Sequence, residues 1–133
     1  MARTVLIVDD HPGFRTSARR VLEADGYRVV GEAQDGRSGI AAARTLRPDI
    51  VLLDVLLPDL DGFEVAAALT GSDDAPIVVL TSSHDLSDFD RLVARSGARG
   101  FVAKADLSGA ALEAPTREIT NLLTYPWVES PSW

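Results

Sequence analysis

The chain has 133 residues, of which 46% are hydrophobic and 25% are charged, and its net charge at pH 7 is −7. Such a chain is typical of one globular domain with its own core, and the absence of cysteine excludes disulfides and thiolate metal sites. The net negative charge differs from the excess of basic residues that nucleic-acid-binding domains usually carry, so we expect no direct nucleic-acid binding by this chain. No apolar run approaches the ~20 residues that span a bilayer. The start lacks the pattern of a signal peptide, so we expect no membrane association and a cytoplasmic protein.

Strand and helix signals alternate five times along the chain. Short apolar runs predict the strands. The second run is shorter and more mixed than the others, which favours a place near an edge of the sheet. The strands are expected over residues 4–8, 27–31, 49–54, 77–81 and 101–103.

Helices are predicted between these strands. Pro12 suits the first turn of a helix, because its missing N–H costs nothing there, and Asp25-Gly26 would end that helix. Asp35-Gly36 opens a second helix that ends before Pro48, and Asp61 is a plausible cap for the third. Further helices are expected over about residues 85–96 and from residue 107 to residue 113.

This alternation implies βαβ units and a mostly parallel α/β sheet with helices on both faces. Continuous apolar runs suit strands that are buried on both faces. Because parallel strands point the same way, the residues that follow them gather along one edge. Four strands end in polar residues there: Asp9-Asp10, Asp54, Thr81-Ser82 and Lys104.

These residue types suit a site for Mg²⁺ and a phosphoryl group. Asp54 is the candidate nucleophile, since a carboxylate can attack phosphorus and form an acyl phosphate. Asp9 and Asp10 could hold Mg²⁺, which prefers oxygen ligands and keeps several waters. Lys104 would neutralise one phosphoryl oxygen, and the Thr81 hydroxyl could donate to another.

Each residue also has an ordinary structural interpretation. An Asp-Asp pair after a strand is commonly a helix cap, Asp54 could be a turn residue, Thr81 another cap, and Lys104 a solvated charge. Their joint placement, each at the end of a different strand, favours the functional interpretation.

These motifs resemble a response-regulator receiver domain of the CheY-like family. The resemblance runs over about residues 3–113, and its details are similar to receivers of the NarL/FixJ type, which usually precede a LuxR-type helix-turn-helix domain. It implies a flavodoxin-like fold with five parallel strands in the order 2-1-3-4-5. The matching pieces are Asp9-Asp10 after the first strand, Asp54 followed by Pro58 and Gly62, Thr81-Ser82, and Gly100-Phe101-Val102-Ala103-Lys104.

The resemblance also implies a site and a partner. A sensor histidine kinase would donate a phosphoryl group to Asp54. Asp10 and Asp54 would bind Mg²⁺ together with the backbone carbonyl of Leu56, and Asp9 would act mainly through water.

In the same resemblance, Lys104 would pair with the phosphoryl group and Thr81 would move toward it. Phe101 would be the aromatic residue that changes rotamer as Thr81 moves. The output face, and a homodimer interface, would lie on the fourth helix, fifth strand and fifth helix.

The chain departs from the family pattern in three places. Ala105 follows the lysine where proline is common, and Leu57 stands where methionine is frequent, which is a mild apolar exchange. Pro115 interrupts the fifth helix, and a proline inside a helix costs about 3 kcal/mol. We therefore expect a receiver domain over residues 1–114 and an atypical segment, a short helix or a flexible tail, over 115–133. No DNA-binding domain follows in this sequence, so one would be missing or reside on another protein.

Two other functions could use an aspartate at the end of a buried strand. One is an aspartyl-phosphate phosphatase acting on external phosphoesters, but the Asp-x-Asp pattern of such enzymes is absent, because Leu56 stands where the second acid belongs. The other is a receiver that binds partners without phosphorylation, which the full set of site residues argues against. His11 is expected in a loop or at a helix start near the acidic residues; it only partly matches the Asp-x-His-x-x-Gly signature of cobalamin-binding domains, because Phe14 stands in the position of the glycine.

Overall fold

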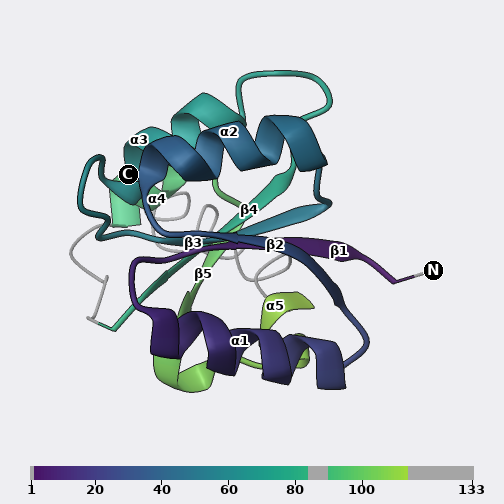
Figure 1. Cartoon of the computed structure of the whole chain (residues 1–133). Coiled ribbons are helices and arrows are strands. Elements are labelled where there is room, and N and C mark those ends of the chain that lie inside the picture. The colour runs from purple at the N-terminus through teal and green to yellow at the C-terminus, as the bar shows by residue number, and fades with distance from the viewer. Residues whose placement is uncertain (1, 84–89, 114–133) are drawn as a thin grey trace, which may run out of the picture.

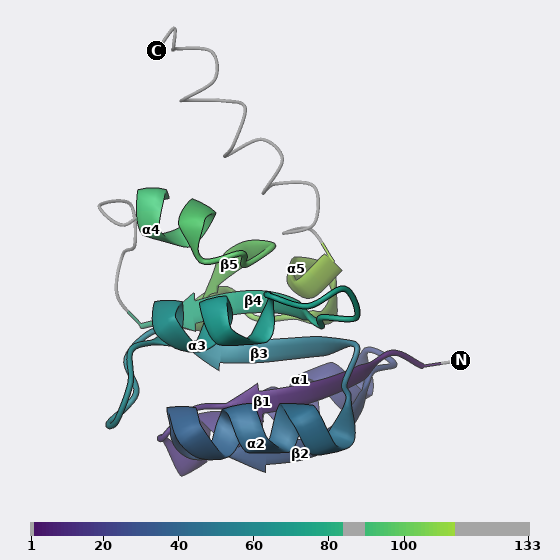
Figure 2. The same ribbon diagram turned by 90° about the horizontal axis from the view of Figure 1, so that it is seen from above.

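A computed structural model describes residues 2–83 and 90–113 of the chain. Within these ranges, five parallel strands form one sheet in the order β2-β1-β3-β4-β5 (Figure 2). This is the expected strand order of a CheY-like flavodoxin fold. The strands are β1 (Thr4–Val8), β2 (Arg28–Ala33), β3 (Ile50–Asp54), β4 (Ile77–Ser82) and β5 (Gly100–Ala103).

Helices cover both faces of the sheet (Figure 1). α2, α3 and α4 lie on one face, and α1 and α5 lie on the other. In the described ranges, no helix has the length and apolar character needed to cross a bilayer. The helices are α1 (Pro12–Ala24), α2 (Gly36–Leu46), α3 (Gly62–Leu69), α4 (Asp90–Arg95) and α5 (Gly109–Glu113), with a short 3-10 turn, η2, over Lys104–Asp106.

The core consists of two clusters, one on each face of the sheet. Successive side chains of a strand point to opposite faces. In β1, Leu6 and Val8 therefore pack in the cluster beneath α2 and α3, whereas Val5 and Ile7 pack in the cluster beneath α1. All four side chains are fully buried, which explains why the apolar run is continuous rather than alternating.

The second strand ends two residues later than the sequence indicates. The apolar run stops at Gly31, but pairing with β1 continues through Glu32 and Ala33. Because β2 is an edge strand, the Glu32 side chain can reach solvent, where Arg15 and Arg19 pair with it at 3.1 and 2.9 Å. Tertiary pairing, rather than hydrophobicity, therefore sets this boundary.

The helix starts at Asp35 and Asp61 are confirmed. The side chains of both residues accept from the backbone N–H three positions later, at 2.8 Å in each case, and each forms a capping box. Pro12 occupies the first turn of α1, as expected. The Asp61 cap ends the loop that follows Asp54.

The fifth helix begins at Gly109 rather than at residue 107, because the Ser108 side chain caps it: Ser108 Oγ accepts from the Ala111 N–H at 2.9 Å. The Gly109 N–H donates to Asp25 Oδ2 at 2.6 Å, so a carboxylate at the end of α1 caps α5. Of the helix expected over 85–96, residues 85–89 lie outside the described residues, as does the segment expected over 115–133.

Candidate functional site

The carboxyl ends of the strands bring the predicted site residues to one edge of the sheet. Val8 and Leu53 are paired in register, so Asp9, directly after β1, and Asp54, the last residue of β3, lie side by side at the ends of neighbouring strands. Asp54 is in register with Thr81 on the next strand, and Lys104 directly follows β5. Residues that are separated by up to about a hundred positions in sequence therefore share one rim because the strands are parallel.

Lys104 links two buried carboxylates. Its Nζ atom lies 2.7 Å from Asp9 Oδ2 and 3.3 Å from Asp54 Oδ2. Asp9 and Asp54 are 1% and 2% exposed, so water screens these charges poorly. The same ammonium lies 4.6 Å from the centroid of the Phe14 ring, a cation–π contact that holds the lysine stem against α1.

Burial is the main cause of a raised pKa at Asp54. The neighbouring Asp9 charge raises this pKa further. The Leu56 N–H, which donates to Asp54 Oδ1 at 3.1 Å, and the Lys104 ammonium both oppose the rise. The ionised carboxylate that attack on phosphorus requires is therefore held in an environment that needs more positive charge than Lys104 supplies.

Thr81 supplies a buried hydroxyl with no hydrogen-bond partner among the described residues. Its exposure is 0%, and its Oγ1 atom neither donates nor accepts there. A buried hydroxyl without a partner costs about 1–3 kcal/mol. This hydroxyl, at the same edge as Asp54, could form a hydrogen bond to a ligand bound there.

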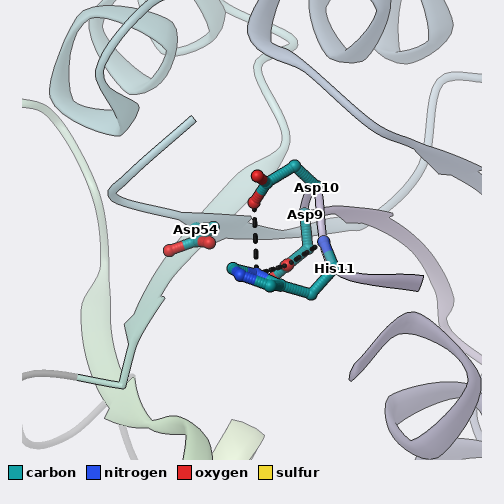
Figure 3. A group of neighbouring side chains, drawn as sticks. All are labelled: Asp9, Asp10, His11 and Asp54. Carbon is teal, nitrogen blue, oxygen red and sulfur yellow. Dashed lines mark hydrogen bonds and ion pairs between the residues drawn. The ribbon is translucent and has the colours of Figure 1, made fainter. Parts of the chain in front are cut away.

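Asp10 and His11 lie beside Asp9 and Asp54 in the same group of side chains (Figure 3). His11 is the N-cap residue of α1, and its Nδ1 atom lies 3.0 Å from Asp9 Oδ1 and 3.1 Å from Asp10 Oδ1. Oxygen or nitrogen atoms of Asp9, Asp10, His11 and Asp54 all lie within 4.8 Å of one another. The sequence placed His11 near this site, but it did not reveal that the imidazole joins two of the acids.

Two contacts of α1 with the site were not found from the sequence. The Arg15 guanidinium donates to the backbone carbonyl of Asp9 at 2.7 Å, and Phe14 lies against Lys104. Phe14 has helical spacing with Ala18 and Leu22 and packs against the same cluster, and that spacing was the signal that the sequence offered. Which part of the interior it faces depends on how α1 packs across the sheet.

The remaining predicted residues lie around this centre. Phe101 is half-buried, is in register with Leu80, and packs against the cluster beneath α2 and α3. Thr81 is in register with Val102, so the Thr81 and Phe101 side chains leave opposite faces of the sheet. Leu56 contributes its backbone N–H to Asp54.

The donor set fits a divalent cation with oxygen ligands. With all groups ionised, three carboxylates and one ammonium leave two negative charges at the rim. Asp9 Oδ2 accepts no hydrogen bond from the described residues and is balanced there only by the Lys104 charge. Mg²⁺ binds through one or two carboxylates and keeps its remaining waters, which this open rim allows.

The fold and the rim together define a class of protein, the CheY-like domains with a flavodoxin fold. Comparison with known families gives the particular family: residues 5–112 match the response regulator receiver domain. The chain therefore belongs to the receiver domains of response regulators in two-component signal transduction.

Individual relatives agree with this assignment. The chain is 40% identical over 126 residues to BvgA of Bordetella pertussis, an alignment that covers 95% of the chain and 60% of BvgA. The signal receiver domain of NarL from Mycobacterium tuberculosis has a TM-score of 0.79 at 32% identity, covering 90% of this chain and 97% of that one. A LuxR-family two-component response regulator from Aurantimonas sp. SI85-9A1 has a TM-score of 0.78 at 30% identity, covering 91% of this chain and 87% of that one.

The chain spans about 60% of the length of the curated relatives it matches first. What is shared is the receiver, and the remainder of each relative lies outside the matched part. Activities that belong to whole relatives are therefore proposals for this protein.

Proposed function

We propose that this receiver is phosphorylated on Asp54 by a sensor histidine kinase in the presence of Mg²⁺. The observation that carries the proposal is the meeting of buried Asp9 and Asp54 with the Lys104 ammonium at one rim, beside the unpartnered Thr81 hydroxyl. The structural alternatives, acids that only cap a helix and a lysine in solvent, do not explain why Asp9 and Asp54 are both almost fully buried.

In the proposed reaction, a carboxylate oxygen of Asp54 attacks the phosphorus of a phosphohistidine. The new P–O bond forms as the P–N bond breaks, and the departing imidazole nitrogen keeps the electron pair and is then protonated. The Leu56 N–H, at 3.1 Å from Asp54 Oδ1, helps to orient the carboxylate for this attack. Lys104 is positioned to neutralise the charge that arrives.

The cation would be held by Asp10 and Asp54, with the Leu56 carbonyl as a further ligand and Asp9 acting through water. Bound Mg²⁺ supplies charge neutralisation between the carboxylate and the phosphoryl oxygens. The excess negative charge of the rim favours this assignment. The Leu56 carbonyl is assigned from the family resemblance.

Phosphorylation would then act as a switch. A phosphoryl group adds about −1.5 to −2 charge at pH 7, which would draw in the Thr81 hydroxyl and Lys104 if the active arrangement binds it better. Phe101 would repack as Thr81 moves. The resulting change would be read on α4, β5 and α5, as a homodimer interface or as a surface for an effector domain. By analogy with the regulators it resembles, that effector would act in transcription.

Incubation with acetyl phosphate and Mg²⁺, followed by intact-mass measurement, tests the central step. One phosphoryl group per chain is expected in the wild type and in Asp73→Asn, an exposed carboxylate away from the rim. None is expected in Asp54→Asn. Equal labelling of Asp54→Asn and the wild type would show that Asp54 is not the acceptor.

The same sample separates the alternatives. Steady turnover of several phosphoester substrates, without accumulation of the modified chain, would favour a phosphatase. No labelling from acetyl phosphate or from any kinase would favour a receiver that binds partners without phosphorylation. Phosphotransfer from a purified kinase domain, lost in Asp54→Asn, would support the kinase as donor.

A further inference from the structure

The acidic rim carries one side chain that the proposed function does not use. His11 begins α1, and 65% of its side chain is exposed. Its Nδ1 atom nevertheless faces inward, at 3.0 Å from Asp9 Oδ1 and 3.1 Å from Asp10 Oδ1 (Figure 3). The His11 backbone N–H also donates to Asp9 Oδ1 at 2.9 Å, which fixes the position of the residue.

The spacing of His11 Nδ1 and Asp10 Oδ1 suits adjacent ligands on one cation. In an octahedral site with bonds of about 2.1 Å, neighbouring ligand atoms lie about 3 Å apart. Nδ1 and Asp10 Oδ1 have about that separation, at 3.1 Å, and Asp9, Asp10, His11 and Asp54 each offer one ligand atom within 4.8 Å of the others. A cation held by Asp10 and Asp54 would therefore lie within reach of Nδ1 without a large movement of the imidazole.

We propose that His11 is a nitrogen ligand of the cation at this rim, and that it makes the site prefer a transition-metal ion such as Co²⁺ over Mg²⁺. The inference rests on the cation site of the proposed function. Mg²⁺ is a hard ion that favours oxygen, whereas imidazole suits the later first-row divalent ions. A site of oxygen ligands alone would gain less from exchanging Mg²⁺ for Co²⁺.

The exposed side of the ring fits this role. Metal binding at Nδ1 requires the ring proton to reside on Nε2. Because most of the side chain faces solvent, Nε2 can keep that proton and bond water. The rim favours a bound cation independently of His11, because three carboxylates share one ammonium there, and Asp9 Oδ2 has an ion pair with Lys104 but no hydrogen-bond partner in the described part of the chain.

The test uses Co²⁺ as the probe on the untagged full chain. The wild type should show a hyperfine-shifted imidazole N–H resonance that disappears in D₂O. His11→Gln should lose this resonance, and its ratio of the Mg²⁺ to the Co²⁺ dissociation constant should fall at least tenfold. The chain has only two histidines, so His84→Gln is the matched control and should keep both properties.

Two results would overturn the inference in distinguishable ways. If the wild type lacks the shifted resonance and His11→Gln keeps the wild-type ratio, while Asp54→Asn weakens both ions, the carboxylate site remains and His11 is not a ligand. If Asp54→Asn and Asp10→Asn bind both ions as the wild type does, the cation site of the proposed function is itself wrong. Because His11 is exposed, His11→Gln should fold, and its thermal unfolding should match that of His84→Gln.

Discussion

The Lys104 ammonium lies closer to Asp9 than to Asp54, at 2.7 Å against 3.3 Å. The acid that is proposed to accept the phosphoryl group therefore has the more distant counter-charge, and burial raises its pKa. Lys104 is also the only lysine in the sequence, since every other basic residue that is not histidine is arginine. A compact ammonium can approach two carboxylates from one point, which the planar guanidinium fork does less well.

Lys104→Met should destabilise the protein in the absence of divalent cations. Removing one partner of a buried ion pair leaves the other charge uncompensated, so we expect a loss of roughly 3 kcal/mol in the free energy of unfolding. Saturating Mg²⁺ should recover part of this loss by binding the same acids. Urea unfolding with EDTA, and then with Mg²⁺, measures both effects. Arg44→Met, at an exposed position of α2, is the control and should change stability by less than about 0.5 kcal/mol.

Lys104 also allows the proposed switch to be observed at a single position. Labelling the lysine side chains with ¹³C and ¹⁵N gives one lysine signal, which should move on treatment with acetyl phosphate and Mg²⁺ in the wild type but not in Asp54→Asn. We expect Lys104→Ala to be phosphorylated but to show a weaker conformational response in its backbone amide spectrum. A response of wild-type size in Lys104→Ala would remove Lys104 from the mechanism.

The raised pKa of Asp54 predicts how stability depends on pH. Above the unfolded value of 3.8, the folded chain binds the Asp54 proton more readily than the unfolded chain. The contribution of Asp54 to stability therefore falls as pH rises from 3.8 through the folded pKa. In EDTA, Asp54→Asn should match the wild type most closely at acidic pH and become the more stable protein near pH 7. A difference between Asp54→Asn and the wild type that does not vary with pH would contradict the raised pKa.

Thr81→Val should stabilise the resting protein while weakening its response to phosphorylation. The substitution removes a buried hydroxyl that has no partner among the described residues, and such a group costs about 1–3 kcal/mol. Thr70→Val is an opposite case, because Thr70 Oγ1 donates to the Ala66 and Ser96 carbonyls at 2.8 and 3.1 Å. That variant should lose about 1 kcal/mol. Thermal unfolding of the two variants should therefore shift in opposite directions.

Gly62→Ala should disturb the Asp54 backbone. A Cβ atom at Gly62 would lie 2.5 Å from the Asp54 carbonyl oxygen and 2.7 Å from Val55 Cα, and neither backbone atom can move aside easily. We expect a destabilisation of about 2–3 kcal/mol and slower labelling by acetyl phosphate. Gly13→Ala has no atom within 4 Å of the added Cβ, and it should stabilise α1 by up to about 1 kcal/mol. Equal stability of the two variants would contradict this close packing.

The apolar runs of β1 and β3, together with the alternation of strand and helix signals, indicated a parallel sheet under two helix layers, because both strands are buried on both faces. The strand order came from the family resemblance. Local chemistry was equally direct at Asp35 and Asp61, where a cap needs only residues within three positions. Boundaries set by distant partners were less accurate. β2 extends to Ala33 because β1 pairs with it. The start of α5 at Gly109 had a local signal in the Ser108 cap, to which Asp25 adds a contact from the end of α1.

The sequence alone thus determined which strands and helices form. It also determined which acids, which hydroxyl and which ammonium lie at the carboxyl edge of the sheet, because parallel strands bring their ends together there. Only the tertiary structure decided how those groups pair there. The preference of Lys104 for Asp9, the position of His11 between two carboxylates and the isolation of the Thr81 hydroxyl depend on ångström-scale distances across separate elements. Hydrogen bonds and close ion pairs depend on such distances, whereas hydrophobic burial depends mainly on the pattern of apolar residues.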